Sequence, residues 1–128
     1  MEILIYLDTH VVIWLYTGNT EYIPSKTLEL MKTQELLLSP MVLLEMTYLF
    51  EIKRLTVTSD QIMNTLIPII NLKVSKLPYS SVIEHAIQQS WTRDPFDRII
   101  VGQAAVKSSL LITKDSHILD HYAYALWS

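Results

Sequence analysis

Short apolar runs alternate along this chain with longer stretches in which apolar residues recur every three or four positions. The first run covers residues 3–7 and ends at Asp8, before the helical spacing of Val11, Trp14 and Leu15. Continuous apolar runs are typical of strands buried on both faces, and the longer period is typical of helices packed against them. The pattern predicts strands at 3–7, 36–38, 74–77, 110–113 and near 125–127.

The predicted helices lie between these strands. Pro40 suits the first turn of a helix that continues to Arg54, and Pro68 is expected to kink or end the helix that begins at Ser59. Strand and helix alternation of this kind predicts an α/β fold with a mostly parallel central sheet. The remaining helices are expected from residue 9, from 25, over 80–89, from 94 to about 107, and from 116.

Length and composition narrow the fold and the location. The chain has 128 residues, of which 50% are hydrophobic, so we expect one domain, residues 1–128, with a sizeable core. It contains no cysteine, which excludes disulfides and thiolate metal sites. The N-terminus carries the acidic Glu2, and no apolar run approaches the roughly 20 residues that span a bilayer. We therefore expect a cytoplasmic protein with no membrane segment.

Two acidic residues follow predicted strands. Asp8 ends the first strand, and Asp115 comes two residues after Thr113 at the end of the 110–113 strand. An N-cap of the next helix explains each acid, and so does a ligand role at the carboxyl edge of a parallel sheet, where such sheets bind their ligands. Residues 113 and 115 of an extended chain point to the same side, so we expect the Thr113 hydroxyl beside the Asp115 carboxylate.

Glu45 interrupts an apolar face of its predicted helix. Its neighbours three and four positions away are apolar or aromatic, whereas Thr47, Glu51 and Arg54 are spaced to form a separate solvated stripe. A carboxylate on a core-facing stripe costs several kcal/mol (~3–5) unless a cation or a donor meets it. An Arg or Lys from another element and a metal ion are both open as the partner of Glu45.

Asp94 and Asp97 belong to an Asp-Pro-Phe-Asp segment at a helix start. Asp94 is best placed to cap the helix, with Pro95 at its first position. Asp97 lies one turn before Val101, so it is expected to face inward and to join the other acids.

Together these acids indicate a cation site. Like charges in one cleft are unfavourable unless protons or cations neutralise them. Mg²⁺ and Mn²⁺ prefer oxygen ligands, and such ions activate water and stabilise charge on a phosphate group. The net charge of −3 on its own argues weakly against nucleic acid binding, but it does not settle the question, because carboxylates committed to a cation contribute part of it.

These motifs resemble those of PIN-domain ribonucleases and, more narrowly, of VapC-like toxins from toxin–antitoxin pairs. The resemblance covers nearly the whole chain, and its strength lies in the order and separation of the motifs. Leu44 and Lys114 depart mildly from it, because such proteins often have Trp and Arg at these positions. The similar segments are LDTHVVIWL (7–15), SPMVLLEMTYLFEIKRL (39–55), the most specific RDPFDRIIVGQA (93–104), LLITKD (110–115) and AYALW (123–127).

The resemblance implies an α/β/α sandwich and an endoribonuclease that depends on Mg²⁺ or Mn²⁺ and leaves a 5′-phosphate and a 3′-hydroxyl. It also implies a homodimer, and inhibition by a cognate antitoxin that inserts a peptide into the active-site groove. Thr9 and Thr113 match hydroxyl positions beside the acids, and Thr113 is a candidate to hold a metal-bound water. Asp94 keeps capping as its first role and metal binding as its second. The residues that match the family's catalytic and metal-binding acids are Asp8, Glu45, Asp97 and Asp115.

Basic residues and histidines give weaker signals. His10 is near Asp8 in sequence, but an ordinary packed or surface role explains it. A solvated surface charge likewise explains each basic candidate for phosphate contact taken singly. These candidates are Lys53, Arg54, Arg93, Arg98 and Lys114.

Two rival functions fit the same fold class. A response-regulator receiver domain has a similar size and an acidic pocket, but it needs paired acids after the first strand and an Asp after a central strand. Here Asp8 is not paired with a second acid in that sense, and no mid-chain strand ends in Asp. An inactive PIN-fold binding protein is the second rival, and the intact set of acids argues against it.

Overall fold

The computed structural model describes residues 3–128, so the Glu2 used in the argument on targeting lies outside the described part. Its five strands are β1 (Leu4–Leu7), β2 (Glu35–Leu38), β3 (Lys73–Val74), β4 (Leu110–Ile112) and β5 (Ala125–Leu126). They form one sheet in the order β3-β2-β1-β4-β5, and all four pairings are parallel. The predicted α/β class and parallel sheet are confirmed.

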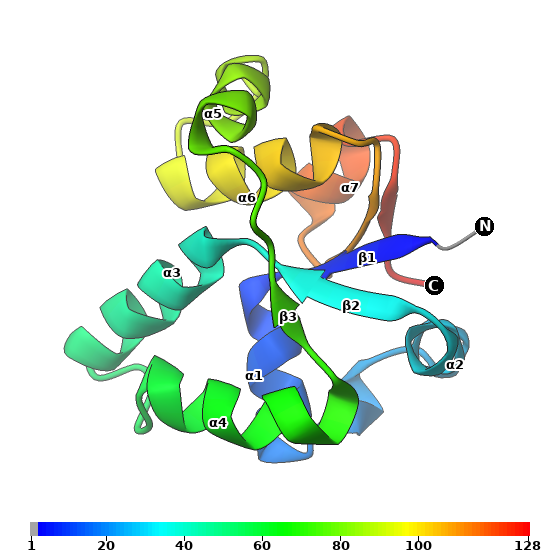
Figure 1. Ribbon diagram of the computed structural model, residues 1–128, viewed down its shortest axis with the longest axis vertical. Coiled ribbons are helices and arrows are strands. Elements are labelled where there is room, and N and C mark those ends of the chain that lie inside the picture. The colour runs from blue at the N-terminus through cyan, green and yellow to red at the C-terminus, as the bar shows by residue number, and fades with distance from the viewer. Residues whose placement is uncertain (1–2) are drawn as a thin grey trace.

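Helices cover both faces of this sheet. They are α1 (Thr9–Thr17), α2 (Ser25–Thr33), α3 (Pro40–Glu51), α4 (Ser59–Ile70), α5 (Tyr79–Ile87), α6 (Pro95–Ala105) and α7 (Ser116–His121). In the view of Figure 1, α1, α3 and α4 lie below the sheet, and α5, α6 and α7 lie above it. This arrangement follows from the strand order, since parallel strands need right-handed crossovers and the chain reverses direction across the sheet after β3.

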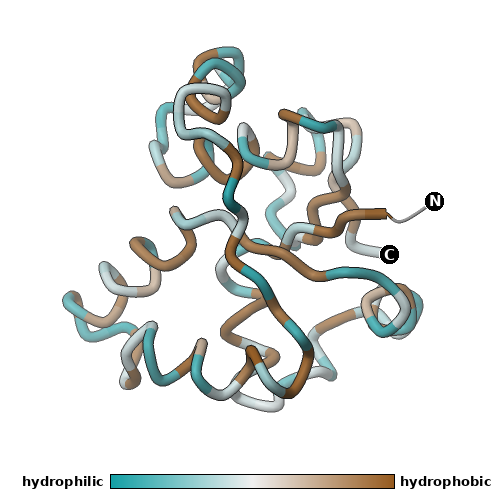
Figure 2. Tube along the Cα trace, viewed as in Figure 1, coloured by the Kyte–Doolittle hydropathy of each residue, from teal (hydrophilic) through white to brown (hydrophobic). Residues whose placement is uncertain are grey.

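The core lies on the sheet and on the helix faces that meet it. Ile5, Leu7, Leu38, Leu111 and Ile112 are each 0% exposed, as expected of strands covered on both sides. Figure 2 shows the same distribution, with hydrophobic colour along β1 and β2 and hydrophilic colour at the outer turns of the helices. Within residues 3–128, no helix combines the length and apolar character that crossing a membrane requires.

Two predicted element ends were wrong by three residues, the C-terminal ends of α3 and of β3. Helix α3 ends at Glu51 instead of Arg54, because the backbone at Lys53 turns to a φ of 64° and the Arg54 N–H closes back on the Leu49 carbonyl at 2.8 Å. Helix α4 passes through Pro68 to Ile70, so this proline does not end it. Strand β3 covers Lys73–Val74 instead of 74–77, and a short 3₁₀ turn at Thr20–Tyr22 was not predicted.

A buried polar network fastens α6 to the sheet. The Gln103 side chain accepts a hydrogen bond from the Ser39 hydroxyl at 2.9 Å and donates one to the Ser75 hydroxyl at 2.9 Å. Ser75 in turn lies 2.9 Å from the Tyr6 hydroxyl of β1. Because buried polar groups are costly when unpaired, this network fixes how α6, which carries Asp97, sits against β1 and β2.

Candidate functional site

Asp8 lies at the carboxyl end of β1, next to the point where the strand order reverses between β1 and β4. Its side chain is 9% exposed, and both carboxylate oxygens have donors. Oδ1 accepts from the Thr9 N–H at 2.8 Å, and Oδ2 accepts from the Thr113 hydroxyl at 2.6 Å. Reversal points of this kind are where open α/β sheets bind their ligands, so the predicted placement of Asp8 is confirmed.

Thr113 serves a different carboxylate from the one expected. Its hydroxyl donates to Asp8 and accepts from the Asp115 N–H at 3.1 Å, so it does not bond the Asp115 carboxylate. The cause is the pairing of β1 with β4, in which Leu7 lies opposite Ile112 and brings Thr113 against Asp8. The hydroxyl therefore fixes the orientation of Asp8.

Glu45 points from α3 toward the same place. Its Oε1 atom accepts a short hydrogen bond from the Thr9 hydroxyl, and the side chain is half-buried. Within residues 3–128, no Arg or Lys forms an ion pair with it, so the structure does not support the cation from another element. Thr9 thus joins the helix that follows Asp8 to the helix that carries Glu45.

Asp94 and Asp115 each cap a helix with one oxygen. Asp94 Oδ1 accepts from the Phe96 N–H at 2.8 Å and the Asp97 N–H at 3.2 Å. Asp115 Oδ1 accepts from the N–H groups of His117 at 2.8 Å and Ile118 at 3.1 Å. Capping was the first role expected for Asp94, and it leaves the second oxygen of each carboxylate without a donor among the described residues.

The five acids line one pocket of about 450 Å³. Asp97, in the first turn of α6, contributes a carboxylate that accepts no hydrogen bond from residues 3–128. The sequence therefore identified every acid that the pocket contains. The lining residues are Asp8, His10, Val11, Trp14, Glu45, Asp94, Asp97, Lys114 and Asp115.

The acids disturb one another's ionisation. Burial raises the pKa of Asp8, against the hydrogen bonds from Thr113 and Thr9 that lower it. Burial also raises the pKa of Glu45, with a further contribution from the Asp8 charge. The pKa of Asp97 rises to about 7, first through desolvation and then through the neighbouring carboxylates, of which Asp94 contributes most. Such a cluster favours protons or cations.

The raised pKa of Asp97 has a measurable consequence for the stability of the fold. A carboxyl group with a raised folded-state pKa stabilises the fold below its unfolded pKa of 3.8, and the contribution disappears as the pH rises through about 7. In EDTA, we expect Asp97→Asn to leave stability unchanged near pH 4 and to increase it by about 1 kcal/mol at pH 8, allowing for water that screens the half-exposed side chain. Thermal melts should show a gain of roughly 3–5 °C at pH 8.

The control for this experiment is Asp60→Asn, an exposed acid in the first turn of α4. Because an acid in the first turn interacts favourably with the helix dipole, this variant should melt at or slightly below the wild-type temperature at pH 8, in the opposite direction from Asp97→Asn. If Asp97→Asn and the wild type melt alike at pH 8 without metal, Asp97 does not carry the charge repulsion that its surroundings indicate.

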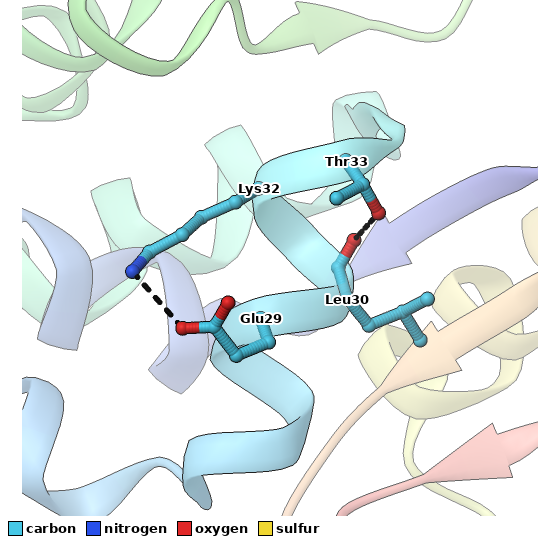
Figure 3. A network of polar contacts seen from close by, with 4 residues as sticks. All are labelled: Glu29, Leu30, Lys32 and Thr33. Carbon is cyan, nitrogen blue, oxygen red and sulfur yellow. Dashed lines mark hydrogen bonds and ion pairs between the residues drawn. The ribbon is translucent and has the colours of Figure 1, made fainter.

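Several of the described positive charges have partners outside the pocket. The Lys32–Glu29 pair on α2, at 3.3 Å, is shown in Figure 3 beside the Thr33–Leu30 hydrogen bond, and neither lines the acidic pocket. The Arg98 guanidinium donates to the Ala86 carbonyl at 3.2 Å and the Ile87 carbonyl at 2.9 Å, at the end of α5, so it joins two helices. Of the five basic candidates, Lys114 alone is among the pocket-lining residues.

Two residues that line the pocket, His10 and Trp14, were not predicted to belong to the site. Trp14 contributed only to the helical period, and a packed or surface role was favoured for His10. Both line the pocket, with their ring centroids 6.1 Å apart. Position on the chain was the available signal, since both lie within two turns of Asp8 on the helix it caps.

The donor set suits a hard divalent cation. Every acidic ligand candidate offers oxygen, which Mg²⁺ and Mn²⁺ prefer, and several of these oxygens have no donor. No group of three or more carboxylate or histidine side chains within residues 3–128 is already arranged to hold a metal.

Comparisons with known proteins extend these observations. The chain matches the PIN domain over residues 5–124. Among solved structures, it resembles a chain of VapBC2 from Rickettsia felis, bound to a DNA fragment from its promoter, with a TM-score of 0.68 and 13% identity over 98% of this chain and 100% of that one. It also resembles DNA-bound VapBC from Salmonella typhimurium, with a TM-score of 0.65 and 17% identity over 98% and 96% of the two chains.

A third similar structure is VapBC-1 from nontypeable Haemophilus influenzae, with a TM-score of 0.64 and 18% identity over 98% and 97% of the two chains. No curated protein matches the chain. At such low identities these structures establish the α/β/α arrangement, and the match over residues 5–124 establishes the family.

Proposed function

Because the chain belongs to the PIN-domain family of nucleases, we propose that it is a metal-dependent endoribonuclease and the toxin of a toxin–antitoxin pair. The observation that supports this most directly is the single pocket lined by Asp8, Glu45, Asp94, Asp97 and Asp115 at the reversal point of the sheet. A receiver domain is disfavoured, because β2 and β3 are followed by Ser39 and Ser75 instead of a phosphoacceptor Asp.

In this proposal, one or two Mg²⁺ or Mn²⁺ ions would be held by Asp8, Glu45, Asp97 and Asp115. Asp94 would bind metal as a second role besides capping its helix. When bound, such an ion activates water and stabilises charge on the phosphate. Thr113 and the Thr9 N–H keep Asp8 in one orientation, and the Thr9 hydroxyl does the same for Glu45. Water adds to phosphorus, the bond to the 3′-oxygen breaks, and that oxygen takes the proton, which leaves a 5′-phosphate and a 3′-hydroxyl.

The test is cleavage by the purified protein of a single-stranded RNA that is labelled at the 5′ end in one sample and at the 3′ end in another. We expect cleavage with Mg²⁺ or Mn²⁺ and none in excess EDTA, with activity restored when the metal is returned. The products should carry 5′-phosphates, which phosphatase removes. The control is Asp97→Asn purified in parallel, which detects a contaminating ribonuclease. Cleavage that persists in EDTA, or products with cyclic phosphates, would exclude this mechanism.

The partner and assembly follow from the same family. The similar structures are VapBC complexes, which supports a cognate antitoxin as the partner of this chain. The proposed RNA substrate and the lack of cysteine support action in the cytoplasm. We also propose that residues 1–128 form one domain. We further propose a homodimer, because Leu44 and Tyr48 on α3 and Ile52 just after its end form an exposed apolar stripe. A solution mass of 14.8 kDa in light scattering would contradict the dimer.

A further inference from the structure

The acidic pocket is also lined by residues that are not acidic. Trp14, His10 and Lys114 line the same space as the five carboxylates. A metal centre built from carboxylates does not need an aromatic ring, and a polar pocket hydrates the flat face of a tryptophan poorly. We therefore expect the pocket to take a ligand with a flat face that can pack on the Trp14 ring.

Two other aromatic residues pack against Trp14. Its ring meets Tyr22 edge-on, with centroids 5.5 Å apart, and packs against Trp127 at 5.8 Å. Trp127 is fixed in turn, because its carbonyl accepts a hydrogen bond from the Thr27 hydroxyl at 3.1 Å. The side chain is half-buried, so the ring presents a rigid, preorganised surface to the pocket.

Lys114 places a positive charge over this surface. Its Nζ atom lies 5.8 Å from the centroid of the Trp14 ring, over the ring, and the residue is exposed. An exposed cation–π contact is weak compared with the stacking of a nucleobase on tryptophan, so a base can displace the ammonium group. The released ammonium is then available to a phosphate, next to carboxylates that would otherwise repel one.

We propose that Trp14 stacks an unpaired nucleobase next to the scissile phosphate, and that Lys114 binds the adjoining backbone. The inference rests on the proposed ribonuclease function and names the residues that would hold a base and the backbone beside it. A base inside a duplex has both faces covered by its neighbours, whereas an unpaired base offers a face to an aromatic side chain. Because every base has such a face, this subsite selects for strandedness more than for sequence. The pocket of about 450 Å³ lies within the range of sites for small ligands.

The test measures binding of a fluorescent single-stranded RNA by anisotropy, with Ca²⁺ in place of Mg²⁺ to limit cleavage. We expect Trp14→Leu to weaken binding by roughly 5- to 150-fold, Trp14→Phe to recover most of the affinity, and duplex RNA to bind weakly to all variants. The matched control is Trp91→Leu, since Trp91 stacks on His121 at 4.9 Å and does not line the pocket. This control should bind RNA as the wild type does.

A second measurement separates stacking from a structural effect. In a series of RNAs that each lack one base, a single position next to the cut should weaken binding to the wild type and make no difference to Trp14→Leu. If Trp14→Leu fails to fold, the series with the wild type and Trp14→Phe still decides the question.

The possible failures are distinguishable. RNA that is bound and cut equally by the wild type and Trp14→Leu overturns the stacking inference alone. A Trp14→Leu protein that binds RNA normally but loses its protein partner shows that the ring is a docking residue, which also overturns the inference. A wild type that neither binds nor cuts RNA overturns the proposed function as well.

Discussion

Replacement of Asp8 by Asn is expected to lower the rate of RNA cleavage by about a thousandfold or more. Asp8 is the most buried acid of the pocket and the one whose two oxygens are both fixed by donors. An amide in its place offers no negative charge to a cation. Under the proposed toxin role, expression of the wild type should arrest growth, and the same substitution should relieve that arrest.

The substitution should leave the fold intact, which makes the loss of activity interpretable. The amide oxygen can accept from the Thr9 N–H, and the amide nitrogen can donate to the Thr113 hydroxyl, so both positions remain paired. Burial raises the pKa of Asp8, so the charged form of this carboxylate is costly to bury. Removing the charge therefore offsets the loss of a charged hydrogen-bond acceptor. Melting curves, cleavage rates and growth curves check the prediction, with Asp60→Asn as the active control. A folded Asp8→Asn protein that cuts RNA at the wild-type rate would remove Asp8 from the site.

The sequence was sufficient for the elements that are buried on both faces. Strands β1, β2 and β4 were predicted because a parallel sheet leaves continuous apolar runs. Four of the acids were found because each follows a strand or begins a helix, and Glu45 was found because it interrupts an apolar helix face. Strand β3 has only two residues, Lys73–Val74, and depends on pairing with β2. The apolar pattern predicted a strand here but placed it at 74–77, because its bounds are set by that pairing and not by the run of apolar residues.

The contacts within the site were harder to predict, because they join distant parts of the chain. Thr113 bonds Asp8 across 105 residues, and Thr9 bonds Glu45 across 36. Local geometry placed Thr113 beside Asp115, which was wrong for its hydroxyl, since strand pairing decides its partner. Trp14 shows the same limit, because helical periodicity treats an aromatic residue that lines a pocket and one inside the core alike.

Gly102→Ala is expected to destabilise the protein by about 2–3 kcal/mol, although alanine is the better helix former by about 1 kcal/mol. Gly102 lies in α6 where this helix touches α5. A Cβ atom there would lie 2.7 Å from the Ala86 nitrogen, 2.9 Å from the Ala86 Cα and 2.9 Å from the Val82 carbonyl oxygen. These are backbone atoms of a packed helix, so the helices must separate. The steric cost therefore exceeds the gain in helix propensity.

The separation of α5 and α6 should also reach the acidic pocket. Gly102 shares its helix with Asp97 and is followed by Gln103, which fastens that helix to the sheet. Urea unfolding measures the loss of stability, and cleavage per folded molecule measures the displacement of Asp97. The control is Gly18→Ala, where the φ of 78° costs about 1 kcal/mol but no atom lies within 4 Å and no acid shares the strain. We expect Gly18→Ala to retain its activity and Gly102→Ala to lose both stability and activity. A Gly102→Ala protein as stable as the wild type would mean that α5 and α6 do not approach this closely in solution.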